Sequence, residues 1–333
     1  SEAKTDPARK FKWASELAAP PQAEDWLWHG FLPSGGITLL SALWKAGKTT
    51  LLSHLLAACG SGGTFLGREI KACKVLYISE EGERHWVRRR DALDLQDNTG
   101  FYLQPFPAKP AMAGWVGFVE QLAKDVEAHG FELVIFDTLA KLWPVAEEND
   151  AGAVDAALMP LWSVTKAGAG VLLIHHIRKS GGMEFTGSRG SGALSAFPDV
   201  IIELKRFNPT DSRDTKRKLT AAGRYIDTPD ELVIELVNGA YRAVSEAEVK
   251  AVMEAASAEV STGEEARVVG YLAGTVEPWC TSVEIRAGLR GDERGGLRNA
   301  DIGAHLNSLL ARGLVKVRGK MRSNTTPRQW ALA

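Results

Sequence analysis

Hydrophobic and polar positions alternate in two ways along residues 26–244 of this 333-residue chain. Short runs that are apolar at nearly every position are separated by longer stretches with helical spacing. Continuous apolar runs are typical of strands that helices cover on both faces. The pattern predicts an α/β domain with a mostly parallel sheet. The expected strands are 37–40, 74–79, 133–137, 170–175, 200–204, 218–222 and 231–236, and the expected helices between them are 82–95, 117–129 and 153–167.

The last seventy residues have a different pattern. Three short helical segments, 264–273, 282–287 and 299–312, precede two strand-like segments, 314–318 and 328–332, which a basic loop joins. Three helices followed by a two-stranded wing is the order of a small winged-helix domain, with 299–312 in the place of the recognition helix. We therefore expect four parts: an N-terminal arm (1–25), the α/β domain (26–244), a helical linker (245–262) and a winged-helix DNA-binding domain (263–333).

The composition is that of an ordinary soluble globular protein, with 45% apolar and 24% charged residues. No apolar run is long enough to span a membrane, and residues 1–12 have no apolar core of a secretory signal. Cys59, Cys73 and Cys280 lie far apart without a C-x-x-C pair, which indicates reduced, structural thiols rather than a zinc site. We expect a cytoplasmic protein with no membrane association.

Charge is unevenly distributed, although the whole chain carries a net charge of only −1. Ten basic and four acidic residues follow position 280, so this end carries +6 and the remainder −7. Segregated positive charge is typical of a nucleic-acid surface, although a solvated basic face is the simpler alternative. The residues of this module that we expect to contact DNA are Arg298, Lys316, Arg318 and Lys320.

The segment ITLLSALWKAGKTTLLSHLLAA, residues 37–58, has the order of a phosphate-binding P-loop: a strand, a short loop ending in Gly-Lys-Thr, and a helix expected from Thr50. The loop N–H groups and the helix N-terminus attract polyphosphate. We expect ATP to bind at residues 46–50, that is, Ala46, Gly47, Lys48, Thr49 and Thr50. Lys48 would reach the β- and γ-phosphates and Thr49 would hold Mg²⁺. One position departs from the motif, because Ala42 stands where its first glycine would be.

Two further strand ends carry polar residues that suit a nucleotide site. Leu-Val-Ile-Phe-Asp, residues 133–137, resembles a Walker-B strand, so Asp137 is the expected Mg²⁺ ligand; an Asp that merely caps a turn is the alternative. The strand Gly-Val-Leu-Leu-Ile-His-His ends in His175 and His176. We favour His176 as the residue that touches the γ-phosphate and senses its loss.

These motifs together resemble a RecA-like P-loop ATPase of the plasmid RepA/DnaB replicative-helicase group. The resemblance covers about residues 26–240 and is carried by WLWHGFLPSGGITLL, SALWKAGKTT, VLYISEEG, LVIFDT, HHIRKSGG and RGSGALSAFPDVIIEL. It implies that Glu81 orients the attacking water. Because side chains alternate along a strand, we expect the neighbouring Glu80 to point away. The arrangement of AAA+ enzymes, with a glutamate directly after the Walker-B aspartate, is absent because Thr138 follows Asp137.

The resemblance also implies an assembly, in which each ATP lies between two subunits of a homo-oligomeric ring, expected to be a hexamer. Arg224 of the neighbouring subunit would be the arginine finger, and Ala222 stands where the family has a second cation. Single-stranded DNA would pass through the pore. The residues implied in contacting it are Arg178, Lys179, Arg189, Gly190 and Gly192.

The expected function is a ring-forming, ATP-dependent DNA helicase or translocase that acts in the replication of a plasmid or mobile element. The alternative is a DNA-binding, ATP-dependent regulator or loader that binds duplex DNA through its winged helix and does not unwind it. A small-molecule kinase is disfavoured by the basic C-terminal module.

Overall fold

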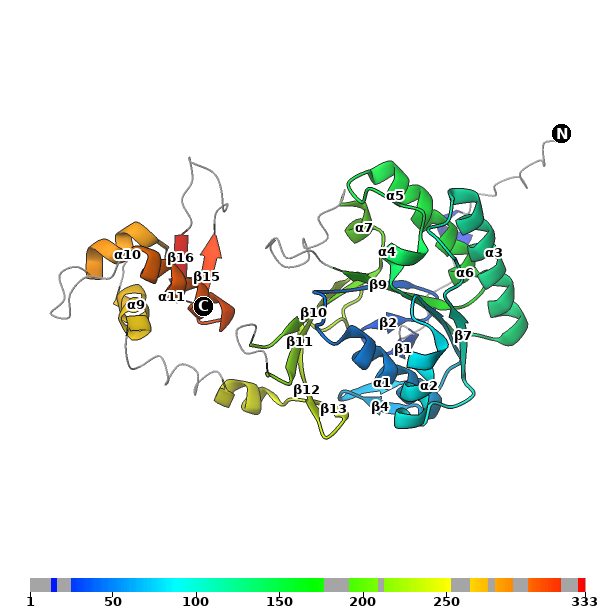
Figure 1. Ribbon diagram of the computed structural model, residues 1–333, viewed down its shortest axis with the longest axis horizontal. Helices are drawn as coiled ribbons and strands as arrows, with labels where there is room; N and C mark the ends of the chain where they lie inside the picture. The colour runs from blue at the N-terminus through cyan, green and yellow to red at the C-terminus, as the bar shows by residue number, and fades with distance from the viewer. Residues whose placement is uncertain are drawn as a thin grey trace.

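The computed structural model describes residues 13–16, 25–176, 192–208, 213–252, 264–274, 279–289, 299–318 and 329–332. Its main feature is a nine-stranded sheet with the strand order β13-β12-β11-β10-β3-β9-β8-β6-β7 (Figure 1). The six strands from β10 to β7 are parallel to one another, whereas β11, β12 and β13 extend the sheet with antiparallel pairing. The predicted α/β architecture with a mostly parallel sheet is confirmed.

All seven predicted strands and the intervening helices are present. The strands of the large sheet are β3 (Ile37–Ala42), β6 (Val75–Ser79), β7 (Thr99–Leu103), β8 (Leu133–Asp137), β9 (Gly170–His176), β10 (Val200–Arg206), β11 (Lys216–Gly223), β12 (Glu231–Val237) and β13 (Ala240–Ala243). The helices of this domain are α1 (Lys48–Ser61), α2 (Glu83–Leu93), α3 (Met112–His129), α4 (Leu139–Leu142), α5 (Ala151–Leu158), η2 (Met159–Leu161), α6 (Trp162–Lys166) and α7 (Ala193–Ala196). A separate small sheet, in the order β2-β1-β5-β4, comprises β1 (Trp26–Trp28), β2 (Leu32–Pro33), β4 (Gly63–Phe65) and β5 (Arg68–Ile70).

Two expectations about helices are wrong in detail. The single helix predicted over 153–167 is divided into α5, the 3₁₀ turn η2 and α6, with Pro160 in the turn. Proline lacks a backbone N–H and cannot continue a helix from its interior. The helix expected from Thr50 begins two residues earlier, at Lys48.

Alternating side chains of the central strands fill two separate cores, one on each face of the sheet. Leu40 of β3 and Tyr77 of β6 pack in the core that α1 covers. Leu39 and Ile78, their neighbours along the same strands, pack in the core that α3, α5 and α6 cover (Figure 1). The strands are apolar at nearly every position because both faces are buried.

The C-terminal module has its own hydrophobic core. Its elements are α9 (Glu264–Gly274), β14 (Cys280–Thr281), α10 (Ser282–Leu289), α11 (Asn299–Ala311), β15 (Val315–Arg318) and β16 (Gln329–Leu332), and the strands pair in the order β14-β16-β15. The three expected helices and two expected strands are present. The additional strand β14 has only two residues, too few for an alternating pattern to be visible.

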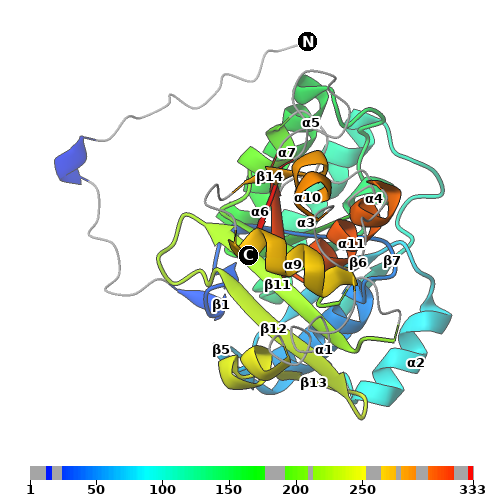
Figure 2. The same ribbon diagram turned by 90° about the vertical axis from the view of Figure 1, so that its left-hand side faces the viewer.

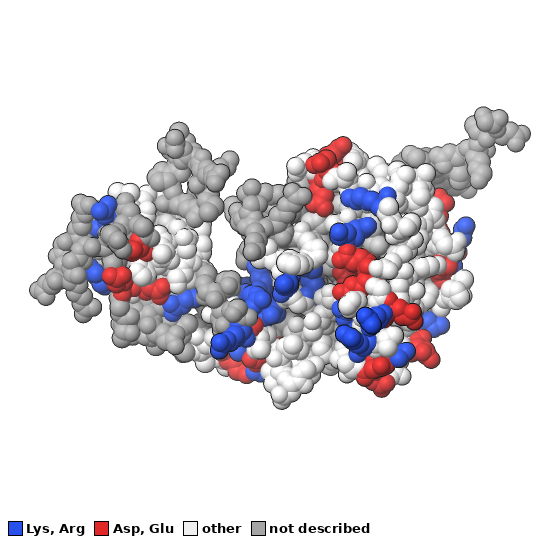
Figure 3. All heavy atoms as spheres, viewed as in Figure 1, with Lys and Arg blue, Asp and Glu red and all other residues white. Residues whose placement is uncertain are grey.

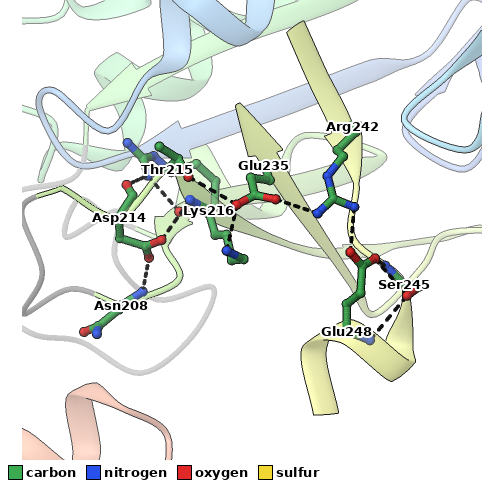
Figure 4. Close-up of polar contacts among 9 residues, drawn as sticks. Asn208, Asp214, Thr215, Lys216, Glu235, Arg242, Ser245 and Glu248 are labelled. Atoms are coloured by element: carbon green, nitrogen blue, oxygen red, sulfur yellow. Dashed lines mark hydrogen bonds and ion pairs between the residues drawn. The ribbon is translucent and has the colours of Figure 1, made fainter. Parts of the chain in front are cut away.

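A chain of ion pairs crosses β11, β12 and β13 at the β13 edge of the large sheet, which faces the viewer in Figure 2. Glu235 of β12 accepts from Lys216 at 2.7 Å and from Arg242 at 2.6 Å, and Arg242 also donates to Glu248 at 2.8 Å (Figure 4). Glu248 and Ser245 hydrogen-bond each other's backbone N–H groups, which is a capping box. These contacts fix the direction in which the chain leaves β13. No described helix is both long and apolar enough to cross a membrane.

Candidate nucleotide site

The P-loop lies at the carboxyl end of β3, between Ala42, the last residue of the strand, and Lys48, the first residue of α1. Gly47 has φ +101°, and a Cβ there would lie 3.3 Å from the Tyr241 hydroxyl, so the position requires glycine. Ala42 is fully buried within β3, and the loop turns only after it. The missing first glycine of the motif is therefore compatible with this backbone.

The Lys48 ammonium is held at the base of the loop. Its Nζ donates to the carbonyl oxygens of Ala42 at 3.3 Å and Leu43 at 3.1 Å, and lies 2.9 Å from Nδ1 of His176. Burial lowers the pKa of Lys48 to about 8, against the opposing effect of Asp137 and Glu80. The lysine thus remains mainly charged near neutral pH, as a phosphate ligand must be.

His176 lies in the site, and its neighbour His175 does not. Burial, reinforced by Lys48, lowers the pKa of His176 to about 4, so its ring is neutral at neutral pH. Because Nδ1 faces the Lys48 ammonium, it acts as the acceptor, and Nε2 carries the proton. His176 can therefore donate a hydrogen bond to an anion. His175 instead pairs with Glu148, its Nε2 lying 3.1 Å from the carboxylate.

Asp137 is buried at the end of β8. Strand β9 lies between β8 and the P-loop strand β3. The Tyr77 hydroxyl donates to the Asp137 carboxylate at 2.6 Å. Burial nevertheless raises the pKa of Asp137 to about 6, and nearby Glu80 and Glu81 add to the shift. A bound cation would relieve this cost. The carboxylate and the Thr49 hydroxyl are hard oxygen donors that suit Mg²⁺, which usually keeps several waters and binds with substrate phosphates.

Glu80 and Glu81 both line the hollow that contains the P-loop, so the expectation that Glu80 points away is wrong. Strand β6 ends at Ser79, and the alternation of side chains ends with it. Burial raises the pKa of Glu80, and the nearby Lys141 opposes this shift. Glu81 forms an ion pair with Arg89 of α2, and its backbone N–H donates to the Ser79 hydroxyl at 3.0 Å.

The hollow has a volume of about 380 Å³, within the range of small-molecule sites. It brings together residues that follow or end four consecutive parallel strands, β3, β9, β8 and β6. Its lining is Trp44, Lys45, Gly47, Lys48, Thr49, Thr50, Glu80, Glu81, Asp137, Thr138 and His176. Ala46 lies in the same loop but is buried beneath it. A buried lysine, loop N–H groups at a helix N-terminus and nearby carboxylates are the groups that a polyphosphate site requires.

Arg224 lies at the opposite edge of the sheet from the P-loop, that is, where the amino ends of β10 and β3 meet. It follows β11, whose last residue, Gly223, pairs with Val200 of β10, and Val200 pairs with Thr38 near the start of β3. Its guanidinium donates to Asp199 at 3.1 Å and is about two-thirds exposed. Because β3 rises about 3.3 Å per residue, roughly 20 Å separates this edge from the P-loop. Arg224 cannot reach the nucleotide site of its own chain.

Arg217 is a cation at the site that sequence analysis missed. It lies on β11, and its Nε donates to the carbonyl of Ala46 at 2.8 Å. Basic side chains gather over the ends of β10 and β11 (Figure 3). Arg217 pairs with Arg206 at the carboxyl end of β10, so the guanidinium contacts the P-loop at the same end of the strands. No motif marks it, because the contact joins residues 171 positions apart.

Most of the residues expected to contact DNA lie outside the described residues. These are Arg178, Lys179, Arg189, Gly190, Arg298 and Lys320. Gly192 precedes α7, with no atom within 4 Å of an added Cβ. Lys316 is exposed on β15, and Arg318 ends that strand. The structure therefore places three members of this set, Gly192, Lys316 and Arg318.

We predict that nucleotide affinity depends on the protonation of Asp137. Its pKa of about 6 lies above the ordinary 3.8, so the carboxyl takes up a proton as the pH falls through 6 and loses its affinity for a cation. Affinity for Mg·ATP should therefore fall below pH 6. In Tyr77→Phe the donor that favours the carboxylate is lost, and the midpoint should move to higher pH. Titrating a fluorescent ATP analogue from about pH 5 to about pH 8 measures this.

The matched control is Tyr102→Phe, which removes a 2.9 Å hydrogen bond from Tyr102 of β7 to Asp125 of α3. Its midpoint should equal that of the unmodified protein. A Tyr77→Phe midpoint that is unchanged, or that moves to lower pH, would contradict the assignment of Asp137.

Comparisons with known proteins identify a family and several similar chains. A family profile described as an AAA domain matches residues 3–182. Protein RecA of Helicobacter pylori (strain Shi470) and of Helicobacter acinonychis (strain Sheeba) are each 27% identical over 193 residues. The match covers 54% of this chain and 51% of the relatives, so the chain spans about half their length. The crystal structure of the RadB recombinase is similar at 18% identity and a TM-score of 0.45, covering 65% of this chain and 93% of that one. Because the profile spans more than half of the sequence, the chain belongs to the AAA domain family, and its core is a RecA-like P-loop ATPase.

Proposed function

We propose that this protein hydrolyses ATP at a site completed by a second subunit, and that it couples hydrolysis to movement on DNA. The observation that carries the proposal is the position of Arg224. It is an exposed cation at the edge of the sheet opposite its own P-loop. Arg224 is too far from its own nucleotide site to act there, but it could act as an arginine finger in the site of a neighbouring molecule. A homo-oligomer in which the two edges meet would place Arg224 of one subunit at Lys48 of the next.

Within one subunit we propose the following roles, which the positions of these residues around the hollow support. Lys48 and the loop N–H groups bind the β- and γ-phosphates, and Thr49 and Asp137 are the residues that would hold Mg²⁺. The metal, when bound, neutralises charge on the phosphates. Glu81 orients the attacking water, and His176 donates from Nε2 to the γ-phosphate. Arg217 keeps the loop in place through the Ala46 carbonyl.

The finer proposal is a ring, a hexamer, that translocates on single-stranded DNA as a helicase of the RepA/DnaB type in plasmid or mobile-element replication. His176 ends β9, and the chain from 177 to 191 leads from it to Gly192 and α7. Loss of the γ-phosphate would thus be transmitted directly to this segment. Its basic residues, Arg178, Lys179 and Arg189, would contact the phosphodiester backbone.

A second candidate is a regulator or loader that binds duplex DNA and does not unwind it. The arrangement of the C-terminal module supports it. The order helix, strand, helix, helix, strand, strand, with β16 between β14 and β15, is compatible with a winged helix and supports this proposal. We propose that α11 is its recognition helix and that Lys316, Arg318 and Lys320 belong to its wing. The domain limits expected above, with 245–262 as linker, are part of this proposal.

The glutamate assignment is tested by a matched pair of variants. Glu81→Gln should bind ATP but hydrolyse it about 10²–10⁴-fold more slowly, the usual loss when a catalytic base is removed. Glu80→Gln should lose far less activity. Lys48→Ala, which removes the phosphate-binding cation, serves as the inactive reference. Steady-state phosphate release, measured with and without single-stranded DNA, gives the rates. The reverse order of the two glutamine variants would transfer the role to Glu80.

The shared site is tested by mixing two inactive variants. Arg224→Ala should lose about 10³-fold or more in ATPase rate. Combined with Glu81→Gln protein, it should regain activity, because one interface in the mixture pairs an intact Glu81 site with an intact Arg224. A mixture as inactive as its components would show that Arg224 does not act across an interface.

Helicase and regulator are separated by a forked DNA substrate with a labelled strand. The helicase proposal predicts ATP-dependent strand displacement that weakens as salt increases, because the contacts are to phosphates. Duplex binding without displacement, lost in a Lys316→Glu variant, would instead support the regulator.

A further inference from the structure

A large aromatic side chain projects from the P-loop into solvent. Trp44 is 73% exposed, and Nζ of Lys45 lies 4.4 Å from the centre of its ring. Leu43 beside it is 41% exposed. Exposed apolar groups that lie together mark interaction surfaces more often than isolated ones do. Trp44 has no role in phosphate binding that requires an indole, so its exposure needs another explanation.

A second hollow lies at the opposite edge of the sheet, around Arg224. It has a volume of about 370 Å³, which is within the range of sites that hold a small molecule. Its lining is Gly35, Ile37, Trp162, Thr165, Ala196, Phe197, Asp199 and Arg224. The rings of Trp162 and Phe197 are stacked, with centroids 5.4 Å apart, and form an aromatic wall. Trp162 is 47% exposed.

We propose that the indole of Trp44 from one subunit occupies this hollow in the next subunit. The occupant is a second copy of this chain. The inference rests on the proposed function, because Arg224 acts on the neighbour's nucleotide only if its edge meets the neighbour's P-loop. The hollow contains Arg224 and the P-loop contains Trp44. The contact that brings the finger to the nucleotide therefore brings the indole to the hollow.

The charges of the two surfaces are complementary. The P-loop surface presents Lys45 beside Trp44, and the hollow contains the Asp199 carboxylate. The hollow also presents the Arg224 guanidinium, which suits the face of an indole ring and the acidic lining of the nucleotide site. Asp199 already holds two groups in place, because it accepts from the Ile37 backbone N–H at 2.9 Å and from Arg224. It therefore fixes the guanidinium relative to β3.

The two surfaces lie at opposite ends of β3, so a chain cannot fill its own hollow. The resulting contact is heterologous, head to tail, and such contacts close into rings when the rotation between subunits permits. Other exposed apolar side chains lie on the hollow's side: Met159 precedes α6 in η2, and Ile226 follows Arg224 by two residues. Burial of these groups with the indole would stabilise the interface.

Two variants that each remove one half of the contact test the proposal. Trp44→Ala removes the indole, and Ala196→Trp fills the hollow from an exposed position. Each alone should raise the dissociation constant of the assembly at least about 30-fold, as expected for a central interface tryptophan. Trp44→Phe should retain most of the affinity, and Val283→Ala, on an exposed position of α10, should retain all of it. Sedimentation velocity with a non-hydrolysable ATP analogue measures the masses.

The decisive sample is an equimolar mixture of the two variants. The Ala196→Trp chain still has Trp44, and the Trp44→Ala chain still has an open hollow, so one interface is intact. The mixture should form heterodimers and grow no further, because one remaining face lacks the indole and the other has a filled hollow. Wild-type-like assembly of either variant alone, or a mixture that contains only monomers, would overturn the proposal.

Failure of this inference is distinguishable from failure of the proposed function. If the Arg224→Ala and Glu81→Gln mixture regains activity while the tryptophan mixture remains monomeric, the shared site stands and Trp44 is not its contact. If neither mixture recovers, both proposals are overturned.

Discussion

The buried ammonium of Lys48 is the constraint on which the nucleotide site depends. A buried cation is costly unless its donors are satisfied. Here the Ala42 and Leu43 carbonyls and His176 Nδ1 satisfy them. These contacts join the P-loop to the end of β9 and keep the His176 ring neutral, with its proton on Nε2. An incoming phosphate would therefore meet a cation and a donor that are already positioned.

The order of the strands determines which residues lie beside Lys48 and which lie at the other end of the sheet. Strands β3, β9, β8 and β6 are parallel neighbours, so their carboxyl ends bring Lys48, His176, Asp137 and the two glutamates to one edge. The antiparallel return of β11 carries Arg224 to the other edge. A ring or filament of head-to-tail subunits is the simplest arrangement that unites both edges, and Trp44 and the Arg224 hollow would form its contact.

Strands could be predicted from the sequence wherever burial on both faces makes every position apolar. Leu39 and Leu40 face different cores, so β3 is apolar throughout and was predicted, whereas the partly exposed β7, which contains Gly100, was not. Lys48 and Asp137, which line one hollow, could be proposed from the sequence because their motifs are local. Glu80 was misplaced because strand alternation was extended past Ser79, where β6 ends. Arg217 was missed because its role depends on a tertiary contact with Ala46.

The central claim, that each active site needs two subunits, is tested most directly by ATPase rate across a dilution series, with the mass distribution measured at the same concentrations. We predict that activity per subunit follows the assembled fraction and disappears as monomers come to dominate. Undiminished activity in a population shown to be monomeric would contradict it.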